Sequence, residues 1–489
     1  MTAIKGVGTR LLLAVVVSAI LVSVLNQTFT NVVVPDIQQD FGTSQGQTGW
    51  IITGYLLVFA VGIPLYGRIA DLYSLRVVFS TGLLVLAAGS LVCALAPTLP
   101  VLVGGRIVQA VGASAIPALG FAAVAKAMPP GKRGAALGLL SSSVGAGAAV
   151  GPVAGGAIAG LAGWHVLFYL TLALSLTLAP AAWRVLPGAP KTDDVPSGIW
   201  GAIHHFDVPS GLALALSAGF ALFGVTQGQE IGFDSPISWG SFALSLVAVV
   251  FFVARIRGIA EPFVSPRLFG NRAFLASSGV GFFFMFANLG SLILAPLMLS
   301  EIDHLSAAGI GLVLAPGAAI VAVLSPFAGR LSDRYGPRLL VRTGLILVLI
   351  STFFLSTVAA GASPILVAAG LAGQGLGFTA ITSPNANAAA AALPPSESGV
   401  GLGIYQMLFF LGGGFGPAIG ATFLAFREQA GAGALNPLYA QDAAPYSDAF
   451  LLLALSVVVA LAASFGLQGK PQSEKIRQRS TSEPQPAEE

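Results

Sequence analysis

The chain has 489 residues, of which 55% are hydrophobic and only 9% are charged, and its mean hydropathy is +0.86. A water-soluble protein carries about 25% charged residues, so this composition excludes a soluble protein and indicates one that crosses a membrane many times. The net charge of +3 comes from basic residues dispersed among loops, which argues against nucleic-acid binding, and the single cysteine, Cys93, excludes an internal disulfide and a cysteine metal cluster.

Fourteen apolar segments follow one another in chain order, each long enough to span a bilayer, which takes about 20 residues. The first follows Lys5 and Arg10, and we predict an uncleaved span rather than a signal peptide because many more spans come after it. The predicted spans lie within 11–31, 47–66, 76–96, 101–125, 134–160, 165–186, 208–226, 238–256, 272–299, 307–328, 339–359, 363–392, 399–425 and 447–467.

The basic residues predict the orientation of these spans. With a cytoplasmic N-terminus, nearly all of the 23 Lys and Arg residues fall on the inner side, as the positive-inside rule requires. The exceptions are Arg106, which lies within a span, and Arg427, which we place in an outer loop. Both termini are therefore expected in the cytoplasm. The polar segment 468–489 is expected to be a disordered tail.

A charged segment occurs twice. Gly67-Arg68-Ile-Ala-Asp71-Leu-Tyr-Ser-Leu-Arg76 follows the second span, and a segment with the same Gly-Arg-x-x-Asp-x-Tyr-x-x-Arg pattern begins at Gly329, 262 residues further on. Each is predicted to form a tight, charged turn at a membrane surface. A carboxylate and an arginine at neighbouring helix ends can latch two helices together, so these segments are candidate gates. The gating candidates are Gly67, Asp71, Arg76, Gly329, Asp333 and Arg338.

A second repeat supports a duplicated chain. Gly147, Gly151, Pro152 and Gly155 in the fifth span match a Gly-x-x-x-Gly-Pro-x-x-Gly pattern in the thirteenth span that begins at Gly412. Such residues allow close helix approach or helix bending. The two repeats predict a six-helix bundle at 1–186, a linker with two inserted helices at 187–270, and a second six-helix bundle at 271–467.

These motifs resemble those of the major facilitator superfamily. The Gly67 segment is similar to the signature loop of that family, and Arg106-Ile-Val-Gln109 is similar to its arginine motif. The stretch from Leu25 to Pro35 resembles the first-span signature of fourteen-span drug:proton antiporters, which include multidrug exporters and Gram-positive tetracycline exporters. The resemblance implies an all-α major facilitator fold and export in exchange for protons, with the proton gradient in place of any cofactor. Asn26 departs from the pattern, since many multidrug members carry an acid there.

Arg106 is the one charge that we place inside the hydrocarbon, where a charge costs at least about 3 kcal/mol. No acid lies near a span centre. Asp36, at the outer end of the first span, is the carboxylate nearest to Arg106 in depth, so these two residues are the candidates for proton coupling. Polar residues in apolar spans need an aqueous or protein-lined side. The candidates for lining a substrate cavity are Asn26, Gln27, Asn31, Gln109, Tyr405 and Gln406.

The sequence therefore predicts a monomeric, multi-pass exporter of small amphipathic compounds in the plasma (inner) membrane of a bacterium, with no metal, no nucleic-acid partner and no enzymatic activity. A narrow-substrate exporter of tetracycline or a metabolite, or an uncoupled carrier, remains an alternative because the mid-span acids are missing. An intramembrane enzyme is disfavoured, since the chain has neither a His-Glu-x-x-His segment nor a phosphate-binding loop. A channel or receptor is disfavoured because nothing resembles a selectivity filter.

Overall fold

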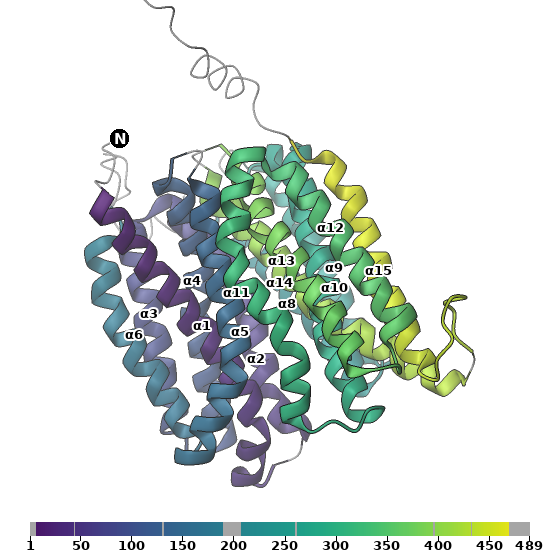
Figure 1. The fold of residues 1–489 in the computed structure, drawn as a ribbon. Helices are drawn as coiled ribbons and strands as arrows, with labels where there is room; N and C mark the ends of the chain where they lie inside the picture. Colours follow the sequence, from purple (N-terminus) through teal and green to yellow (C-terminus); the bar gives the residue numbers. More distant parts are fainter. Residues whose placement is uncertain are drawn as a thin grey trace, which may run out of the picture.

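The computed structural model describes residues 6–43, 45–129, 132–188, 207–259, 262–394, 397–431 and 433–468 (Figure 1). Throughout these ranges every regular element is a helix, which confirms the predicted all-α fold. The long helices are α1 (Gly6–Phe41), α2 (Gln45–Leu72), α3 (Leu75–Ala94), α4 (Leu99–Ala127), α5 (Arg133–Ala162), α6 (His165–Val185), α8 (Val208–Ile231), α9 (Pro236–Gly258), α10 (Arg272–Glu301), α11 (Ala307–Tyr335), α12 (Pro337–Phe354), α13 (Pro364–Ala391), α14 (Ser398–Ala430) and α15 (Ala444–Ala463).

Each of the fourteen predicted spans coincides with one of these helices. Within the described residues, thirteen helices are long and apolar enough to cross a membrane. The remaining one, α5, is 30 residues long and packs between α1 and α11. Short helical segments join some of the others: η1 (Pro266–Gly270) precedes α10, the π-helical η2 (Leu355–Ala359) extends α12, and η4 (Ser464–Gly466) follows α15.

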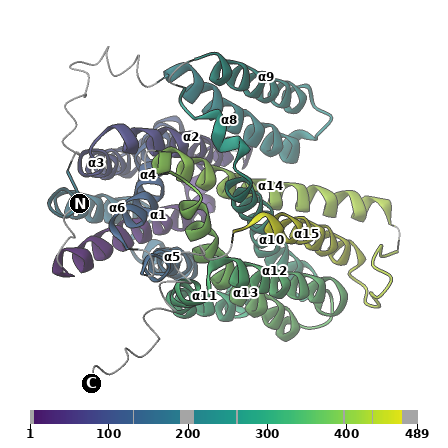
Figure 2. The same ribbon diagram turned by 90° about the horizontal axis from the view of Figure 1, so that it is seen from above.

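Two groups of six helices make up most of the molecule. We call α1–α6 the first repeat and α10–α15 the second repeat. Within the first, α3 packs on α4 and α6, and α1 on α5; within the second, α10 packs on α14 and α15, and α13 on α11 and α12. The repeats meet along two seams, where α5 contacts α11 and α2 contacts α14 (Figure 2).

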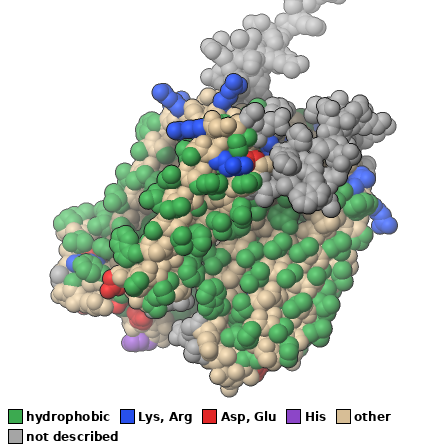
Figure 3. Space-filling view, turned by 180° about the vertical axis from the view of Figure 1, so that it is seen from behind, with side chains coloured by type: hydrophobic (Ala, Val, Ile, Leu, Met, Phe, Trp, Pro, Cys, Tyr) green, Lys and Arg blue, Asp and Glu red, His purple; other side chains and the backbone are tan. Residues whose placement is uncertain are grey.

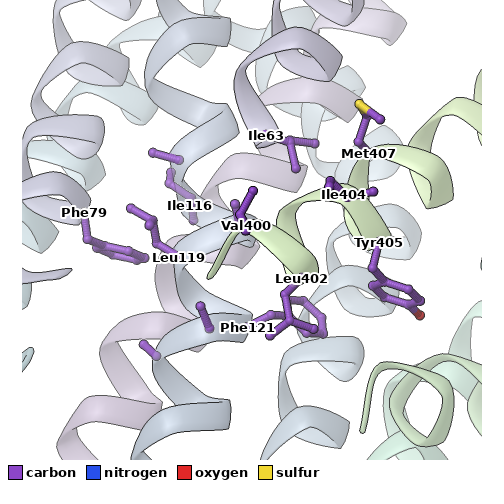
Figure 4. Close-up of a cluster of buried hydrophobic side chains, with 14 of the residues drawn as sticks. Ile63, Phe79, Ile116, Leu119, Phe121, Val400, Leu402, Ile404, Tyr405 and Met407 are labelled. Carbon is purple, nitrogen blue, oxygen red and sulfur yellow. The ribbon is translucent and has the colours of Figure 1, made fainter. Parts of the chain in front are cut away.

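The α2–α14 seam shares a hydrophobic core with the first repeat. Val400, Leu402 and Tyr405 of α14 belong to the same buried cluster as Ile63 of α2 and Leu119 of α4 (Figure 4). The inserted helix α8 lies over this seam and contacts both α2 and α14, while α9 packs on the outside of α8 (Figure 2). A helix between the repeats in sequence therefore bridges them in space.

A wide apolar surface surrounds the helices. Figure 3 shows hydrophobic side chains covering the flank of the molecule, with most of the visible Lys and Arg side chains gathered at one end. Leu246 and Val247 of α9 are both 64% exposed, and Leu161 at the end of α5 is 90% exposed. Exposed apolar side chains over this area match the hydrocarbon of a bilayer.

The inserted helices are anchored by one carboxylate. Asp207, which precedes α8, is buried and accepts a hydrogen bond from Nε of Arg255 at 3.1 Å and from the backbone N–H of Phe263 at 3.1 Å. Arg255 belongs to the last turn of α9, and Phe263 follows that helix. The carboxylate therefore ties the start of α8 to the end of α9.

The segment between α14 and α15 corrects one expectation. Arg427, which we expected in an outer loop, lies in the last turn of α14 and forms a buried ion pair with Asp448 of α15, with 2.7 Å between Nε and Oδ2. Arg427 also donates to the carbonyl of Gly433, and the other oxygen of Asp448 accepts the N–H of Leu435 at 2.7 Å. The helices extend further than the apolar runs suggest because this pair neutralises their charged ends.

Candidate functional site

Each repeated charged segment contains a tight turn between two helices, as predicted, but most of the segment is helical and the turn occupies only one or two residues of it. Helix α2 continues to Leu72 and α11 continues to Tyr335, so Gly67 and Gly329 with their following residues form the last turns of these helices. On the second copy the turn itself is Gly336 alone, whose positive φ of 88° ends the helix. The helices can extend this far because charged side chains at a helix end reach the aqueous interface.

Asp333 joins the two repeats. Its carboxylate oxygens accept hydrogen bonds from the backbone N–H groups of Gly134 at 2.9 Å and Ala135 at 3.0 Å. These N–H groups belong to the first turn of α5, where the helix has no internal acceptors and the dipole favours a negative charge. A carboxylate of α11 therefore caps a helix of the other repeat. Ser383 of α13 adds a hydrogen bond to the carbonyl of Gly134 at 2.9 Å.

The first glycine of each charged segment lies where two backbones touch. A Cβ atom on Gly329 would collide with the carbonyl of Gly134, and one on Gly67 would lie 2.6 Å from the carbonyl oxygen of Gly399 in α14. One turn along, Gly138 faces the carbonyl of Ser325 in the same manner. The glycines are therefore explained by contact between the repeats, at both seams and at the same end of the molecule.

The predicted Asp71–Arg76 latch is only partly described. The side chain of Asp71 lies outside the described residues. Arg76 donates from Nε to the carbonyl of Leu186 at 3.0 Å, so it joins the start of α3 to the end of α6. Arg338, its counterpart in the second repeat, is exposed.

Arg106 lies about two turns into α4 and is only 1% exposed. Its Nη1 donates to Oε1 of Gln109 at 2.7 Å, and its Nε donates to the carbonyl of Ile51 at 3.3 Å. The Tyr55 ring covers the guanidinium, with 4.0 Å between the ring centroid and Cζ. Such a cation–π contact is worth about 2 kcal/mol when desolvated. The charge is thus held by uncharged groups from α2 and α4.

Gln109 orders a polar network across three helices. Its Nε2 donates to Oγ of Ser90 in α3 at 2.7 Å and to Oδ1 of Asn26 in α1 at 3.2 Å. The Oε1 atom is left to face Arg106. All of these side chains are buried. The network therefore fixes the side chain that receives the arginine.

The second repeat contains the same network without the charge. Nε2 of Gln374 donates to Oγ of Ser291 at 2.9 Å and to Oγ1 of Thr352 at 3.0 Å, from α13 to α10 and α12. These three residues match Gln109, Asn26 and Ser90 in the repeat, and Leu371 occupies the position of Arg106. The sequence prediction missed Ser90, Thr352, Ser291 and the role of Tyr55. Matching the two repeats residue by residue would have found the first three.

A row of aromatic rings leads from Arg106 into the second repeat. Tyr55 stacks on Phe59, with ring centroids 5.6 Å apart, and Phe59 meets Phe410 of α14 edge-on at 5.2 Å. Phe410 contacts Phe409 at 5.7 Å, and Phe409 contacts Tyr405 at 6.2 Å. The row crosses the α2–α14 seam and connects the surroundings of Arg106 with Tyr405 of α14.

The predicted cavity residues separate into three groups. Asn26 and Gln109 share the network around Arg106, whereas Tyr405 and Gln406 are buried in α14, where the Tyr405 hydroxyl accepts from Nδ2 of Asn385 at 3.2 Å. The two remaining residues, both on α1, are less buried: Gln27 is half-buried and Asn31 is exposed.

The predicted partner of Arg106 is not beside it. Asp36 is exposed near the far end of α1, and among the described residues no carboxylate lies within ion-pair distance of the guanidinium. The structure therefore does not bring Asp36 and Arg106 together in this conformation.

The glycine motif of α5 is a contact surface for α1. A Cβ atom on Gly147 would lie 2.8 Å from Val24, one on Gly155 would lie 2.8 Å from the Phe29 ring, and one on Gly151 would collide with Thr28. The side chain of Pro152 lies outside the described residues. Close packing accounts for the three glycines, and bending stays a prediction.

Comparison with known proteins gives consistent matches along the chain. The family model described as Major Facilitator Superfamily matches residues 16–294 and 275–488. The riboflavin transporter RibZ of Clostridioides difficile is 27% identical over 86% of this chain and 90% of its own length. The lincomycin resistance protein LmrB of Listeria monocytogenes is 27% identical over 84% of this chain and 85% of its own length.

Two further matches extend this set. The multidrug resistance protein Stp of Mycobacterium tuberculosis is 28% identical over 82% of this chain and 73% of its own length. Among solved structures, the transporter FucP covers 93% of this chain with a TM-score of 0.61 and 14% identity. At that identity the likeness concerns the fold alone.

Proposed function

The chain belongs to the major facilitator superfamily, and we propose that this transporter exports small amphipathic compounds from bacterial cells in exchange for protons, by alternating access. The relatives named for lincomycin and multidrug resistance support export, since the chain matches most of their length. The aromatic and amide side chains between Arg106 and Tyr405 suit a ligand with an apolar body and a few polar groups. We place the chain in the plasma membrane as a monomer, with both termini in the cytoplasm and without enzymatic activity.

The observation that carries the mechanism is the duplicated contact at one end of the molecule. Gly67 and Gly329 bring the repeats into backbone contact at both seams, and Asp333 caps α5 across one of them. Because these contacts involve helix ends and short hydrogen bonds, they can open as a unit, together with the part of the hydrophobic cluster that α14 shares with α2 and α4. Opening them and closing the opposite end would expose the central residues to the other side.

Proton coupling is assigned to Arg106, with Asp36 as the titrating carboxylate. In the present conformation Arg106 is satisfied by Gln109 and Tyr55, so the proposal requires a second conformation in which Asp36 approaches it. Replacement of Asp36 by Asn tests whether this carboxylate is the group that titrates. Proton-driven export that persists in that variant would remove Asp36 from the mechanism.

The test uses inverted membrane vesicles with an imposed pH gradient and a pH-sensitive dye. Tetracycline, a quaternary ammonium dye, a fluoroquinolone and a neutral macrolide are added one at a time. We expect drug-dependent proton release with the wild-type chain and none with Arg106→Ala. Labelled compound that moves down its own gradient without any proton response would instead identify an uncoupled carrier.

A narrow-substrate exporter is the second candidate. The riboflavin transporter RibZ matches this chain as well as the resistance proteins do. A response to a single compound of the panel, or to riboflavin alone, would favour this reading over multidrug export.

A further inference from the structure

The charge of Arg106 has no acidic partner in the described part of the chain. Its side chain is 1% exposed, and its contacts are the Gln109 amide, the Ile51 carbonyl and the Tyr55 ring, all of which are uncharged. The buried ion pair Arg427–Asp448 shows how this protein neutralises a buried guanidinium elsewhere. A buried cation held only by dipoles attracts a negative charge from outside the chain.

Two buried polar atoms beside this arginine lie near each other without forming a hydrogen bond of good geometry. They are Nδ2 of Asn26 and the hydroxyl oxygen of Tyr55, on side chains that are each 1% exposed. Asn26 is bound to Gln109 through its Oδ1, so its N–H donors face the Tyr55 hydroxyl, which also interacts with Ser23. Together with the guanidinium, these groups form a cluster with more donors than acceptors.

The second repeat shows that folding does not require this cluster. Leu371 stands in place of Arg106, Ser291 in place of Asn26, and Gly317 in place of Tyr55, whereas the central glutamine is kept as Gln374. A Cβ atom on Gly317 would lie 2.7 Å from the carbonyl oxygen of Leu371, so the backbones are close where the first repeat has a cation under a ring. The additional donors therefore belong to one repeat only.

We propose that Arg106, Asn26 and Tyr55 bind the negatively charged group of the transported compound, so that the substrates are amphipathic anions such as aromatic carboxylates. This inference rests on the proposed export function and names its substrate class. The carboxylate neutralises Arg106 and accepts from the N–H groups of Asn26, which turn to it from the Tyr55 hydroxyl as the Tyr55 ring moves aside. The row from Tyr55 through Phe59 to Phe410 offers aromatic faces to the apolar body of the compound.

The test compares three ligands that share one ring system. Tritiated naphthalene-1-acetate is bound to the purified full-length protein, and the neutral naphthalene-1-acetamide and cationic 2-(1-naphthyl)ethylammonium compete for it. We expect the carboxylate to bind at least 10-fold tighter than the amide, and the ammonium to compete least. Equal affinity for the carboxylate and the amide, or tighter binding of the ammonium, would overturn the proposal.

Two substitutions at one position test the charge directly. Asn26→Asp places a carboxylate inside the chain next to the network, so binding of naphthalene-1-acetate should fall at least 10-fold. Asn26→Ser copies Ser291 of the second repeat, so it removes the amide donors without adding a charge and should cost less affinity than Asn26→Asp does. Unchanged carboxylate affinity in Asn26→Asp contradicts the proposal. Both variants are compared only after each is shown to be monodisperse and folded.

The same protein in liposomes separates this inference from the proposed function. Selective binding of naphthalene-1-acetate without any transport in response to a pH gradient would contradict proton-driven export and leave the anion site standing. Proton-driven export of cationic drugs with no preference for the carboxylate would support the proposed function and overturn the anion site.

Discussion

The carboxylate of Asp333 accepts the backbone N–H of Gly134 at 2.9 Å, so a residue of α11 caps α5 across the boundary between the repeats. An acceptor at a helix N-terminus contributes about 1 kcal/mol, and its negative charge adds to this through the helix dipole. The stability of the closed end of this transporter therefore depends on a charge that lies outside the helix that it caps.

Replacing Asp333 by Ala should open this end more often. We expect the closed population to fall roughly 5-fold or more, since about 1 kcal/mol of capping is lost. Hydrogen exchange of the peptide that contains Gly134 and Ala135 measures this directly and should become faster. Asp234→Asn, at an exposed carboxylate between α8 and α9, is the control and should leave that peptide unchanged. Unaltered exchange in Asp333→Ala would show that the cap does not hold the seam.

The glycine at the start of each charged segment should not tolerate a side chain. Gly329→Ala places a methyl group against the carbonyl of Gly134, so we expect at least a 10-fold loss of transport rate because the seam cannot close. Gly311→Ala in the same helix meets open space and serves as the matched control. Comparable rates in the two variants would mean that close backbone contact at the seam is dispensable.

The central glutamines should differ in importance between the repeats. Gln109→Leu removes the acceptor of a buried guanidinium and should lower the free energy of unfolding by about 3 kcal/mol, whereas Gln374→Leu removes a neutral contact and should cost about 1–2 kcal/mol. Cys93 is the single cysteine and is fully buried, so its labelling by a thiol-reactive fluorophore during heating reports unfolding. Equal losses would show that the hydrogen bond from Arg106 to Gln109 contributes no more stability than the neutral contacts of Gln374.

Removing one of the two charges in the ion pair between α14 and α15 should lower the free energy of unfolding. Asp448→Asn leaves the buried Arg427 without its counter-charge and weakens the anchor of Leu435, so we expect a loss of about 3–5 kcal/mol. The double variant Arg427→Met with Asp448→Leu removes both charges and should recover part of that loss. The same thiol-labelling assay measures both. A double variant no more stable than the single one would mean that the hydrogen bonds to the loop matter more than the charges.

The sequence predicted the helices well because membrane spans are set by length and apolarity, which are local. The relation between the repeats was also readable, since Gly67 and Gly329 share a pattern. The function of these glycines could not be predicted, because their partners are backbone atoms of helices far along the chain, such as the carbonyl of Gly134. A contact with a backbone atom requires no particular residue type at the partner position, so the sequence does not reveal it.

The surroundings of Arg106 were predicted in part. Its burial and its link to Gln109 follow from helical spacing, since the two residues are three apart on α4. Its pairing with Asp36 was inferred from depth alone, and depth does not fix which way a side chain turns around its helix. Tyr55 covers Arg106 because α2 presents that face to α4, a rotation that the apolar run of α2 does not encode.

The hydrogen bonds of Asp207 make the α8–α9 hairpin a separate unit with adjoining ends, which we call the cassette. Its carboxylate holds the entry and the exit of the hairpin side by side, through Arg255 and Phe263. A piece with adjoining ends and two crossings can be removed, or exchanged for another hairpin, without inverting any helix that comes after it. A chain shortened in this way would keep both repeats and lose the cover over the α2–α14 seam, so lipid would reach helices that the cassette now shields.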